Sequence, residues 1–526
     1  MSVCIGLGSP MLMTFSLMMT ILNKRWIRKK FGNTLSTSGA RRNPEPGIVA
    51  RARAALVIAE DAQQVPMRLI QREGWLARQI VLDVHTTWWK DAAKSLESTR
   101  RGVTLSLVAQ LSVAVISWIL AIVGSLTQNV GDTAEALALS AGSLWIWLVP
   151  VIIGWVLVGT QNKSDTISAA VGKTRSSRDV QCGIHVAGDF LADPSSVCVN
   201  ATGPTNGTGN TDRTERRKKF WNVNVYGYQK QQGPAFNYAR ALTWINFADR
   251  LHDAFEKAIE VYHRPENQDL AGLPDEQGSH VRVSEASGLT PENCRPDNHS
   301  QRPPTPTSPT PPATSTDSLA SQTVLLTTHD LREYPALEEV SSDARSAFWE
   351  HIAFSMLMGV FLQWGTTSLA FAMAHETVVK GLGCRSGAYL LYGILSTFGC
   401  FSMLLSAALS HFTMRGYELT PSRRGAPLVG AFAVMTLLLG RFLLVANTTW
   451  LLVMSIWELI GFFDSCYCAS AEFSKGAEGW VLLFKVADDL KEDAQMPWGV
   501  CIGLGLAEVL LAILVFGGHK EPKRTT

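Results

Sequence analysis

Long apolar runs constrain what this chain can fold into more than any other feature of its sequence. A helix needs roughly 20 mostly apolar residues to cross the hydrocarbon core of a bilayer. Such runs predict six spans, over residues 3–22, 103–124, 143–160, 352–374, 387–409 and 498–518. Charged residues make up only 17% of the chain, whereas a soluble domain has about 25%. The sequence therefore predicts an all-α fold, a polytopic transmembrane helical bundle.

A further apolar run, residues 428–463, is too long for one span. Its 36 residues would form a helix about 54 Å long, against a hydrocarbon core of about 30 Å. Arg441 lies near the middle of the run, and a charge at the bilayer centre costs at least about 2.5–3.5 kcal/mol. We therefore predict a span over 442–463, with Arg441 as an interfacial charge and 428–440 as an interfacial or re-entrant piece. The total is about seven spans, since an eighth would place the basic C-terminal residues outside.

The distribution of basic residues predicts the orientation of the bundle, because Lys and Arg in short loops mark the cytoplasmic side. Residues 23–102 carry sixteen Lys and Arg against seven Asp and Glu, whereas the 125–142 loop carries no basic residue. The positive charges follow the first apolar run, as in a signal anchor whose N-terminus lies outside. The predicted organisation is a signal-anchor span at 1–22, a basic cytosolic or interfacial helical region at 23–102, a transmembrane hairpin at 103–160, a cytosolic loop at 161–351, a transmembrane bundle at 352–463, an extracytoplasmic loop at 464–497, a last span at 498–518 and a basic cytosolic tail at 519–526.

The predicted cytosolic parts are partly helical. Residues 51–98 have apolar residues at helical spacing, followed by basic ones. With Trp88 and Trp89, this pattern suits either a helix along the headgroups or a small cytosolic packing unit. In the long loop, helical spacing of apolar residues predicts an amphipathic helix at 235–262. Residues 265–345 contain a Pro/Thr/Ser tract that cannot form a core, so they are predicted to be a disordered linker.

Charge and topology also bear on the partners of the protein. The net charge of +2 gives no indication of nucleic-acid binding. Basic clusters at 23–30 and 216–219 suit contact with anionic lipid, although such clusters can also be plain solvated charge. The 161–345 loop offers docking sites for unidentified proteins. Glycosylation sequons at Asn200 and Asn206 fall in this predicted cytosolic loop, and we expect them to stay unmodified.

Four stretches of the membrane portion form a recognisable set. They are GSLWIWLVPVIIGWVLVG at 142–159, LQWGTTSLAFAMA at 362–374, GLGCRSGAYLLYGILST at 381–397 and FFDSCYCAS at 462–470. Their order and spacing resemble those of an uncharacterised family of fungal multi-spanning integral membrane proteins, and the QWGTT…GLGCRSG…CYC block is the specific part. The resemblance implies kinship and a fungal origin, with no established activity. Where the family has an Asn-Ser pair after CYC, this chain has Ala469 and Ser470.

The GLGCRSG stretch at 381–387 is predicted to be a tight turn on the outer face, because a phosphate loop needs a preceding strand and a Lys-Ser/Thr pair. On this topology Cys384, Cys466 and Cys468 face an oxidising compartment, where a disulfide from Cys384 to either of the others would persist. A bond between Cys466 and Cys468 themselves would be strained. The alternative, a metal held together with His375, lacks a complete ligand set. We therefore predict a disulfide and no metal or cofactor.

Polar residues within the predicted spans form a second candidate site. Ionisable groups in spans normally pair with one another or line a polar pathway. Glu458 and Glu508 come from consecutive spans. Together with Gln363, Thr366 and Thr367 they are predicted to form an intramembrane polar track. The alternative is that Glu508 is neutral and hydrogen-bonded between helices, while Glu458 reaches the membrane surface.

These observations bound the function. The sequence offers neither a clear nucleophile–base pair nor a metal cluster, so an enzyme is not predicted. We expect a non-enzymatic integral membrane protein, of a scaffold or sensor-like kind, in the plasma membrane or an endomembrane. The alternative is a transporter or channel for a small solute or ion that uses the polar track, although the sequence shows no internal repeat to support it.

Overall fold

The computed structural model is described here at residues 6–40, 46–61, 63, 67–69, 86–98, 112, 116, 119, 123, 140–158, 184–186, 219–220, 223–224, 238–262, 334–376, 381–419, 426–465, 468, 473 and 487–518. The helices are α2 (Pro10–Ala40), α3 (Pro46–Asp61), α5 (Thr86–Ser98), α8 (Leu148–Val158), α11 (Ala241–Tyr262), α13 (Ser342–Glu376), α14 (Cys384–Leu419), α15 (Ala426–Leu459), the short η9 (Phe462–Asp464) and α17 (Ala487–Gly517). Two small antiparallel ladders pair β1 (Met67–Leu69) with β2 (Ile184–Val186) and β3 (Lys219–Phe220) with β4 (Val223–Asn224). The sequons, residues 216–218 and most of the predicted linker lie outside the described residues.

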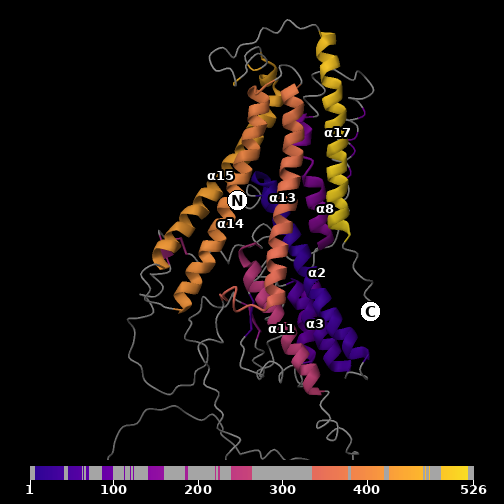
Figure 1. Ribbon diagram of the computed structural model, residues 1–526, viewed down its shortest axis with the longest axis vertical. Coiled ribbons are helices and arrows are strands. Elements are labelled where there is room, and N and C mark those ends of the chain that lie inside the picture. The colour runs from indigo at the N-terminus through magenta and orange to yellow at the C-terminus, as the bar shows by residue number, and fades with distance from the viewer. Residues whose placement is uncertain are drawn as a thin grey trace, which may run out of the picture.

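Long helices run side by side through most of the molecule (Figure 1). α13 lies in the middle, with α14 and α15 on one side and α8 and α17 on the other, while α2, α3 and α11 gather towards one end. Five of the described helices are long and apolar enough to cross a membrane, as expected of a membrane protein. They are Ser140–Val158, Ser342–Glu376, Cys384–Gly416, Leu428–Leu459 and Gly499–Gly517. Seven spans remain a prediction, because 103–124 lies outside the described residues except for four single positions.

The first helix differs from the predicted signal-anchor span at 1–22. α2 continues without interruption to Ala40, so its apolar and basic parts form one helix. Its apolar half is enclosed by other helices; Met11 and Leu17, for example, are 0% exposed. α2 runs antiparallel to α13. Asn23 of α2 bonds to His351 of α13, whereas Met11, earlier in α2, packs against Gly359, later in α13. α2 can be buried because its polar side chains have hydrogen-bond partners inside the protein. The apolar run in the sequence does not show that these partners exist.

Other helices extend beyond the predicted spans. α13 begins at Ser342, and α17 begins at Ala487 within the predicted loop 464–497. α15 is one continuous helix with Arg441 near its middle, so no break separates residues 428–440 from the predicted span at 442–463. Apolar length shows which residues suit the bilayer, whereas a helix continues for as long as its backbone hydrogen bonds do. The 34-residue α15 is about 51 Å long, so Arg441 is interfacial only if one end of α15 projects from the bilayer.

The helices outside the bundle pack as a unit against α2. Trp89 of α5 is 1% exposed and meets Phe255 of α11 edge to face, with ring centroids 5.6 Å apart. Of the two interpretations of 51–98, the packing unit therefore describes α5. The helical pattern was wrong around β1, which follows Pro66; proline removes a helical hydrogen bond and disfavours helix in the residue before it.

The amphipathic helix predicted at 235–262 is present as α11, which begins at Ala241. The predicted disordered linker ends earlier than expected. Tyr334 is 1% exposed, and its ring lies edge to face against His411 of α14. Residues 334–341 are therefore part of the packed structure and lead directly into α13, whose first residues 342–345 also belong to the predicted linker.

Candidate functional site

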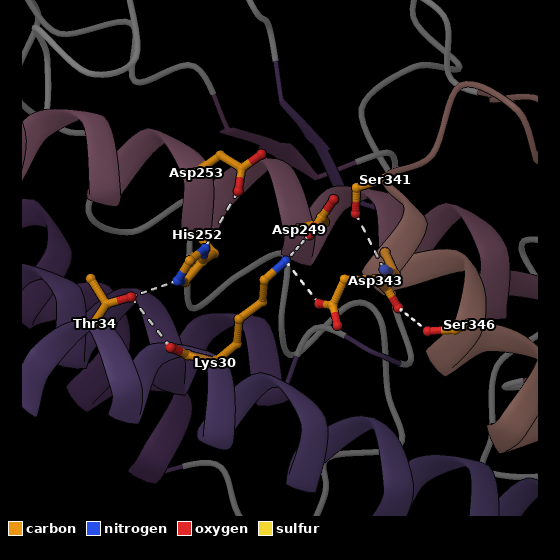
Figure 2. A network of polar contacts seen from close by, with 9 residues as sticks. Lys30, Thr34, Asp249, His252, Asp253, Ser341, Asp343 and Ser346 are labelled. Atoms are coloured by element: carbon orange, nitrogen blue, oxygen red, sulfur yellow. Dashed lines mark hydrogen bonds and ion pairs between the residues drawn. The ribbon is translucent and has the colours of Figure 1, made fainter. Parts of the chain in front are cut away.

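A group of charged and polar side chains joins three helices at one end of the bundle (Figure 2). Lys30 of α2 pairs with Asp249 of α11 and, at 3.4 Å, with Asp343 in the first turn of α13. One turn further along α2, Thr34 Oγ1 lies 2.7 Å from Nε2 of His252, again on α11. We call Lys30, Thr34, Asp249, His252 and Asp343 the polar junction. It connects residues that are far apart in the chain.

The polar junction places charge where water is largely excluded. Asp249 is 4% exposed, so its carboxylate depends on Lys30 for compensation. Burial alone would lower the pKa of Lys30, but the hydrogen bond and charge of Asp249, with smaller contributions from Asp253 and Asp343, raise that pKa above its ordinary value. The Lys30 ammonium also lies 5.1 Å from the centre of the Trp26 ring, which favours the charged form. Lys30 is thus held as a cation.

Further polar contacts continue along α2 towards the bundle. Arg28 Nη2 donates to Glu60 of α3 at 2.8 Å. Asn23 accepts from His351 Nδ1 at 2.8 Å and donates weakly to Gln63 at 3.4 Å. All of these groups are wholly or largely buried. α2 is therefore fixed to α3 and α13 by hydrogen bonds as well as by apolar packing.

Several basic side chains of the predicted lipid-binding cluster 23–30 bond to groups inside the protein. Lys24 is 1% exposed, and its Nζ donates to the last carbonyl of α8, Val158 O, at 2.8 Å. A cation at a helix C-terminus also matches the helix dipole. Arg28 and Lys30 have the carboxylate partners given above, and Lys29 remains exposed. Contact of this cluster with anionic lipid stays a prediction, and it now involves fewer of the basic side chains.

One group of side chains beside the polar junction has the composition of a metal site. His252, Asp253 and Glu256, on one turn of α11, bring their possible ligand atoms within 4.8 Å of one another. In the structure His252 Nδ1 faces Asp253 Oδ1 at 3.4 Å, and this hydrogen bond lowers the pKa of Asp253. Glu256 is exposed. The contact gives the His252 imidazole a carboxylate partner on its own helix.

The GLGCRSG stretch forms a turn and the start of a helix. Gly381 has φ 146°, which a side chain would strain, and α14 begins at Cys384. Arg385, in the first turn, makes two hydrogen bonds to Glu458 near the end of α15, at 2.9 and 3.1 Å. The guanidinium also lies 5.4 Å from the centre of the Phe463 ring. The arginine therefore fastens α14 to α15 and is not available to hold a phosphate.

Two of the three predicted disulfide residues meet. Cys384 packs against the apolar cluster that contains Cys468, so that the two thiols lie near each other, and the structure holds both as free thiols. Cys466 lies outside the described residues. The proximity that a disulfide requires is thus present, while the bond itself is not formed.

Mild oxidation of the purified protein is expected to join Cys384 to Cys468, because adjacent thiols exchange readily with an oxidant. The cross-linked peptide should be detected by mass spectrometry without reduction and should disappear after reduction. Cys400 is 0% exposed and serves as the internal control that stays unmodified. If an alkylating reagent added after the oxidation still modifies Cys384 and Cys468, the two thiols have not been joined. That result would contradict the observed contact.

The predicted polar track is divided. Gln363 and Thr367 are joined by a 3.0 Å hydrogen bond. The Thr366 hydroxyl instead donates to Leu362 O of its own helix at 2.9 Å. Glu458 pairs with Arg385, as described above. The proposed line of groups therefore does not continue from Gln363 to this acid.

Glu508 lies at a comparable depth but on another face of α13. Its carboxylate fills the space that a side chain at Gly365 would need. Gly365 is two residues after Gln363, which corresponds to about 200° around the helix. Glu508 Oε1 is buried and has no hydrogen-bond partner among the described residues. Glu508 and Gln363 thus belong to separate environments.

Sequence reasoning missed most of the polar junction and its neighbours. Lys30 was assigned to a lipid-binding cluster, Asp249 to the polar face of the predicted helix at 235–262, and Asp343 to the predicted linker. None of the three was expected to have a partner inside the protein, because a helical pattern assigns charged residues to the outer face. The polar residues Ser9, Ser396 and Asn447 sit within apolar runs, and that position was a usable signal. Comparison with protein-family models, curated proteins and solved structures finds no match to this chain. The site is therefore interpreted from its own geometry.

Proposed function

We propose that this protein has a non-enzymatic, scaffold or sensor-like role in a membrane, in which α2 links the bundle to the helices at one end. The position of Lys30 carries the proposal. It lies on α2 and pairs with both Asp249 of α11 and Asp343 of α13. Displacing α11 would carry the buried Asp249 carboxylate away from its cation, and breaking a buried ion pair is costly. A change in α11 is therefore passed to two helices of the bundle.

Apolar packing supports the same coupling. A single buried cluster contains Met11 of α2, Cys400 of α14 and Leu437 of α15, together with Trp89 of α5 and Phe255 of α11. Close-packed interiors transmit displacement because they contain few voids into which a side chain can move. The bundle and the outer helices thus share one core, and α11 belongs to the long segment between two predicted spans. A partner that binds this segment would act on the bundle through that core.

The test uses Cys400 as a reporter, because it is 0% exposed and lies on α14. In the full chain reconstituted in lipid nanodiscs, Asp249→Asn is expected to weaken the polar junction. The rate at which a membrane-permeant maleimide labels Cys400 should then rise by about tenfold, which corresponds to about 1.4 kcal/mol less cost of local opening. Labelling is followed by peptide mass spectrometry.

Glu256→Gln is the matched control, because Glu256 is exposed on the same helix. It should leave the Cys400 labelling rate unchanged. Hydrogen exchange of α11 is measured in parallel. If Asp249→Asn speeds exchange in α11 and leaves Cys400 as protected as before, the outer helices move independently of the bundle and the proposed coupling is wrong.

Transport of a small solute or ion is the second candidate function. The predicted track does not support it, because Glu458 and Glu508 lie in separate environments. A different feature favours it, namely an interruption of the helix before Pro10 inside the bundle. Interrupted helices form the binding sites of many transporters.

A further inference from the structure

A helix is interrupted deep inside the bundle. Residues 6–8 form a helical turn, Ser9 is not helical, and α2 starts at Pro10. Ser9 caps α2: its Oγ accepts from Leu12 N at 3.1 Å and its carbonyl accepts from Met13 N at 3.2 Å. Pro10 has no N–H to satisfy and suits the first helical position. Ser9 therefore accepts hydrogen bonds from two of the backbone N–H groups in the first turn of α2.

Polar side chains from three other helices meet at this point. Ser396 Oγ lies 3.2 Å from Ser9 Oγ and donates to Gln363 Oε1 at 2.7 Å, while Asn447 Nδ2 donates to Gly8 O at 2.8 Å. We call Gly8, Ser9, Gln363, Ser396 and Asn447 the break cluster. The four side chains in it are 0% exposed.

The depth of the break cluster follows from the helices that supply it. Ser396 and Asn447 each lie twelve residues from the shared end of the bundle, counted from Cys384 at the start of α14 (396 − 384) and from Leu459 at the end of α15 (459 − 447). Twelve helical residues correspond to about 18 Å. With the start of α14 and the end of α15 near one face of a core about 30 Å thick, the cluster lies well within the hydrocarbon region.

Asn447 provides an independent indication of a ligand. Its Nδ2 is committed to Gly8, and its Oδ1 is buried without a hydrogen-bond partner among the described residues. An unsatisfied buried acceptor costs about 1–3 kcal/mol. The side chain is directed at the helix interruption, because it already contacts Gly8 there. A group that donates to Asn447 Oδ1, or a cation, would remove this cost.

The uncommitted groups at the interruption are neutral oxygens. Besides Asn447 Oδ1, the carbonyls of Leu7 and Gly8 each accept one hydrogen bond, from Tyr392 and Asn447, and a carbonyl oxygen has two lone pairs. An anion would need donors, which Ser9 has largely consumed. A divalent cation prefers carboxylates, and Glu508 lies on another face of α13. Interrupted helices in transporters hold Na⁺ through main-chain carbonyls.

We propose that the break cluster binds a monovalent cation, Na⁺ or K⁺, through Asn447 Oδ1 and the main-chain carbonyls of Leu7 and Gly8. Neutral oxygens replace the hydration shell of such ions in selective sites. The bound ion stabilises the interruption, because it interacts with carbonyls that no longer have a helical donor. This site does not depend on the coupling through Lys30.

The experiment measures binding of radioactive sodium, and of rubidium as the potassium analogue, to the full chain in nanodiscs. N-methyl-D-glucamine chloride keeps the ionic strength constant. Saturable binding of one of the two ions is expected. Asn447→Leu should weaken it by about tenfold or more, the usual loss when a group that supports an ion is removed, whereas Asn447→Asp should strengthen it by adding a negative charge. Thr449→Val is the matched control, because Thr449 is exposed and bonds only to its own helix, at Val445 O.

The two Asn447 variants separate a ligand from a structural role, since both lose the donor to Gly8 and only one keeps and strengthens the acceptor. Equal loss of binding in both would assign Asn447 a packing role and overturn the site. The wild-type protein alone is decisive if neither variant folds. Absence of saturable binding for both ions would mean that a water molecule, or nothing, satisfies Asn447 Oδ1, and the proposal would be wrong.

Discussion

Lys30→Met is expected to lower the free energy of unfolding by about 3 kcal/mol, because it leaves the Asp249 carboxylate buried without its cation. Asp249 is 4% exposed, so water cannot take over the role of the ammonium. Methionine has a similar length and keeps the apolar contacts of the lysine stem. The loss is measured as the thermal transition of the purified protein in detergent, followed by tryptophan fluorescence.

Two further variants make this result specific. Lys29→Met removes the neighbouring charge, which is exposed, and should change the transition little. The double variant Lys30→Met, Asp249→Leu removes both members of the pair and should recover most of the lost stability, since an apolar replacement of a buried pair is often neutral. If Lys29→Met and Lys30→Met behave alike, Lys30 and Asp249 do not form the buried pair described.

Gly8→Ala is expected to prevent the helical turn at residues 6–8, which precedes α2, from packing against α15. A Cβ at Gly8 would lie 2.1 Å from Leu444 O and 2.9 Å from Leu444 C. These are backbone atoms of α15, so the conflict cannot be relieved by a change of rotamer. Overpacking of a well-packed core costs about 1–3 kcal/mol or more. We expect a large loss of monodisperse protein on size-exclusion chromatography after solubilisation.

Gly6→Ala is the matched control for this substitution. It adds the same methyl group two residues earlier, where the nearest atom is Met13 Sδ at 3.7 Å, an ordinary van der Waals contact. The Gly6 variant should therefore elute like the unaltered protein. Similar profiles for the two alanine variants would mean that Gly8 does not approach α15 as closely as observed.

The spans were predictable to the extent that burial in lipid depends on local composition. The runs at 352–374 and 387–409 lie within α13 and α14, because about 20 apolar residues in sequence have few other stable environments. The amphipathic spacing likewise located α11. Helix ends were not predictable from these runs, since polar residues such as those before 352 extend a helix as well as apolar ones do.

The candidate site was much less predictable, because its contacts have no local signature. Lys30 and Asp249 are 219 positions apart, and Arg385 and Glu458 are 73 apart. Neither pair has a fixed spacing that chemistry demands, unlike a metal-binding motif. The usable local signal was the position of Ser9, Ser396 and Asn447 within apolar runs, which is typical of buried polar groups. The contacts of Cys384 with Cys468 were expected from topology, which constrains which loops share a side of the membrane.

The central position of α2 determines when during synthesis this protein can be completed. Ser9 contacts Ser396, Gly8 contacts Asn447, and Arg25 donates to Val515 O, over separations of 387, 439 and 490 positions. A ribosome adds about 5–20 residues each second. The residues at the start of α2 therefore wait on the order of a minute for these partners to be synthesised. During that time Gly8, Ser9 and Arg25 have only water, lipid headgroups or chaperones in place of these late partners. The yield of folded protein should therefore depend on the insertion machinery more than on the stability of the finished bundle.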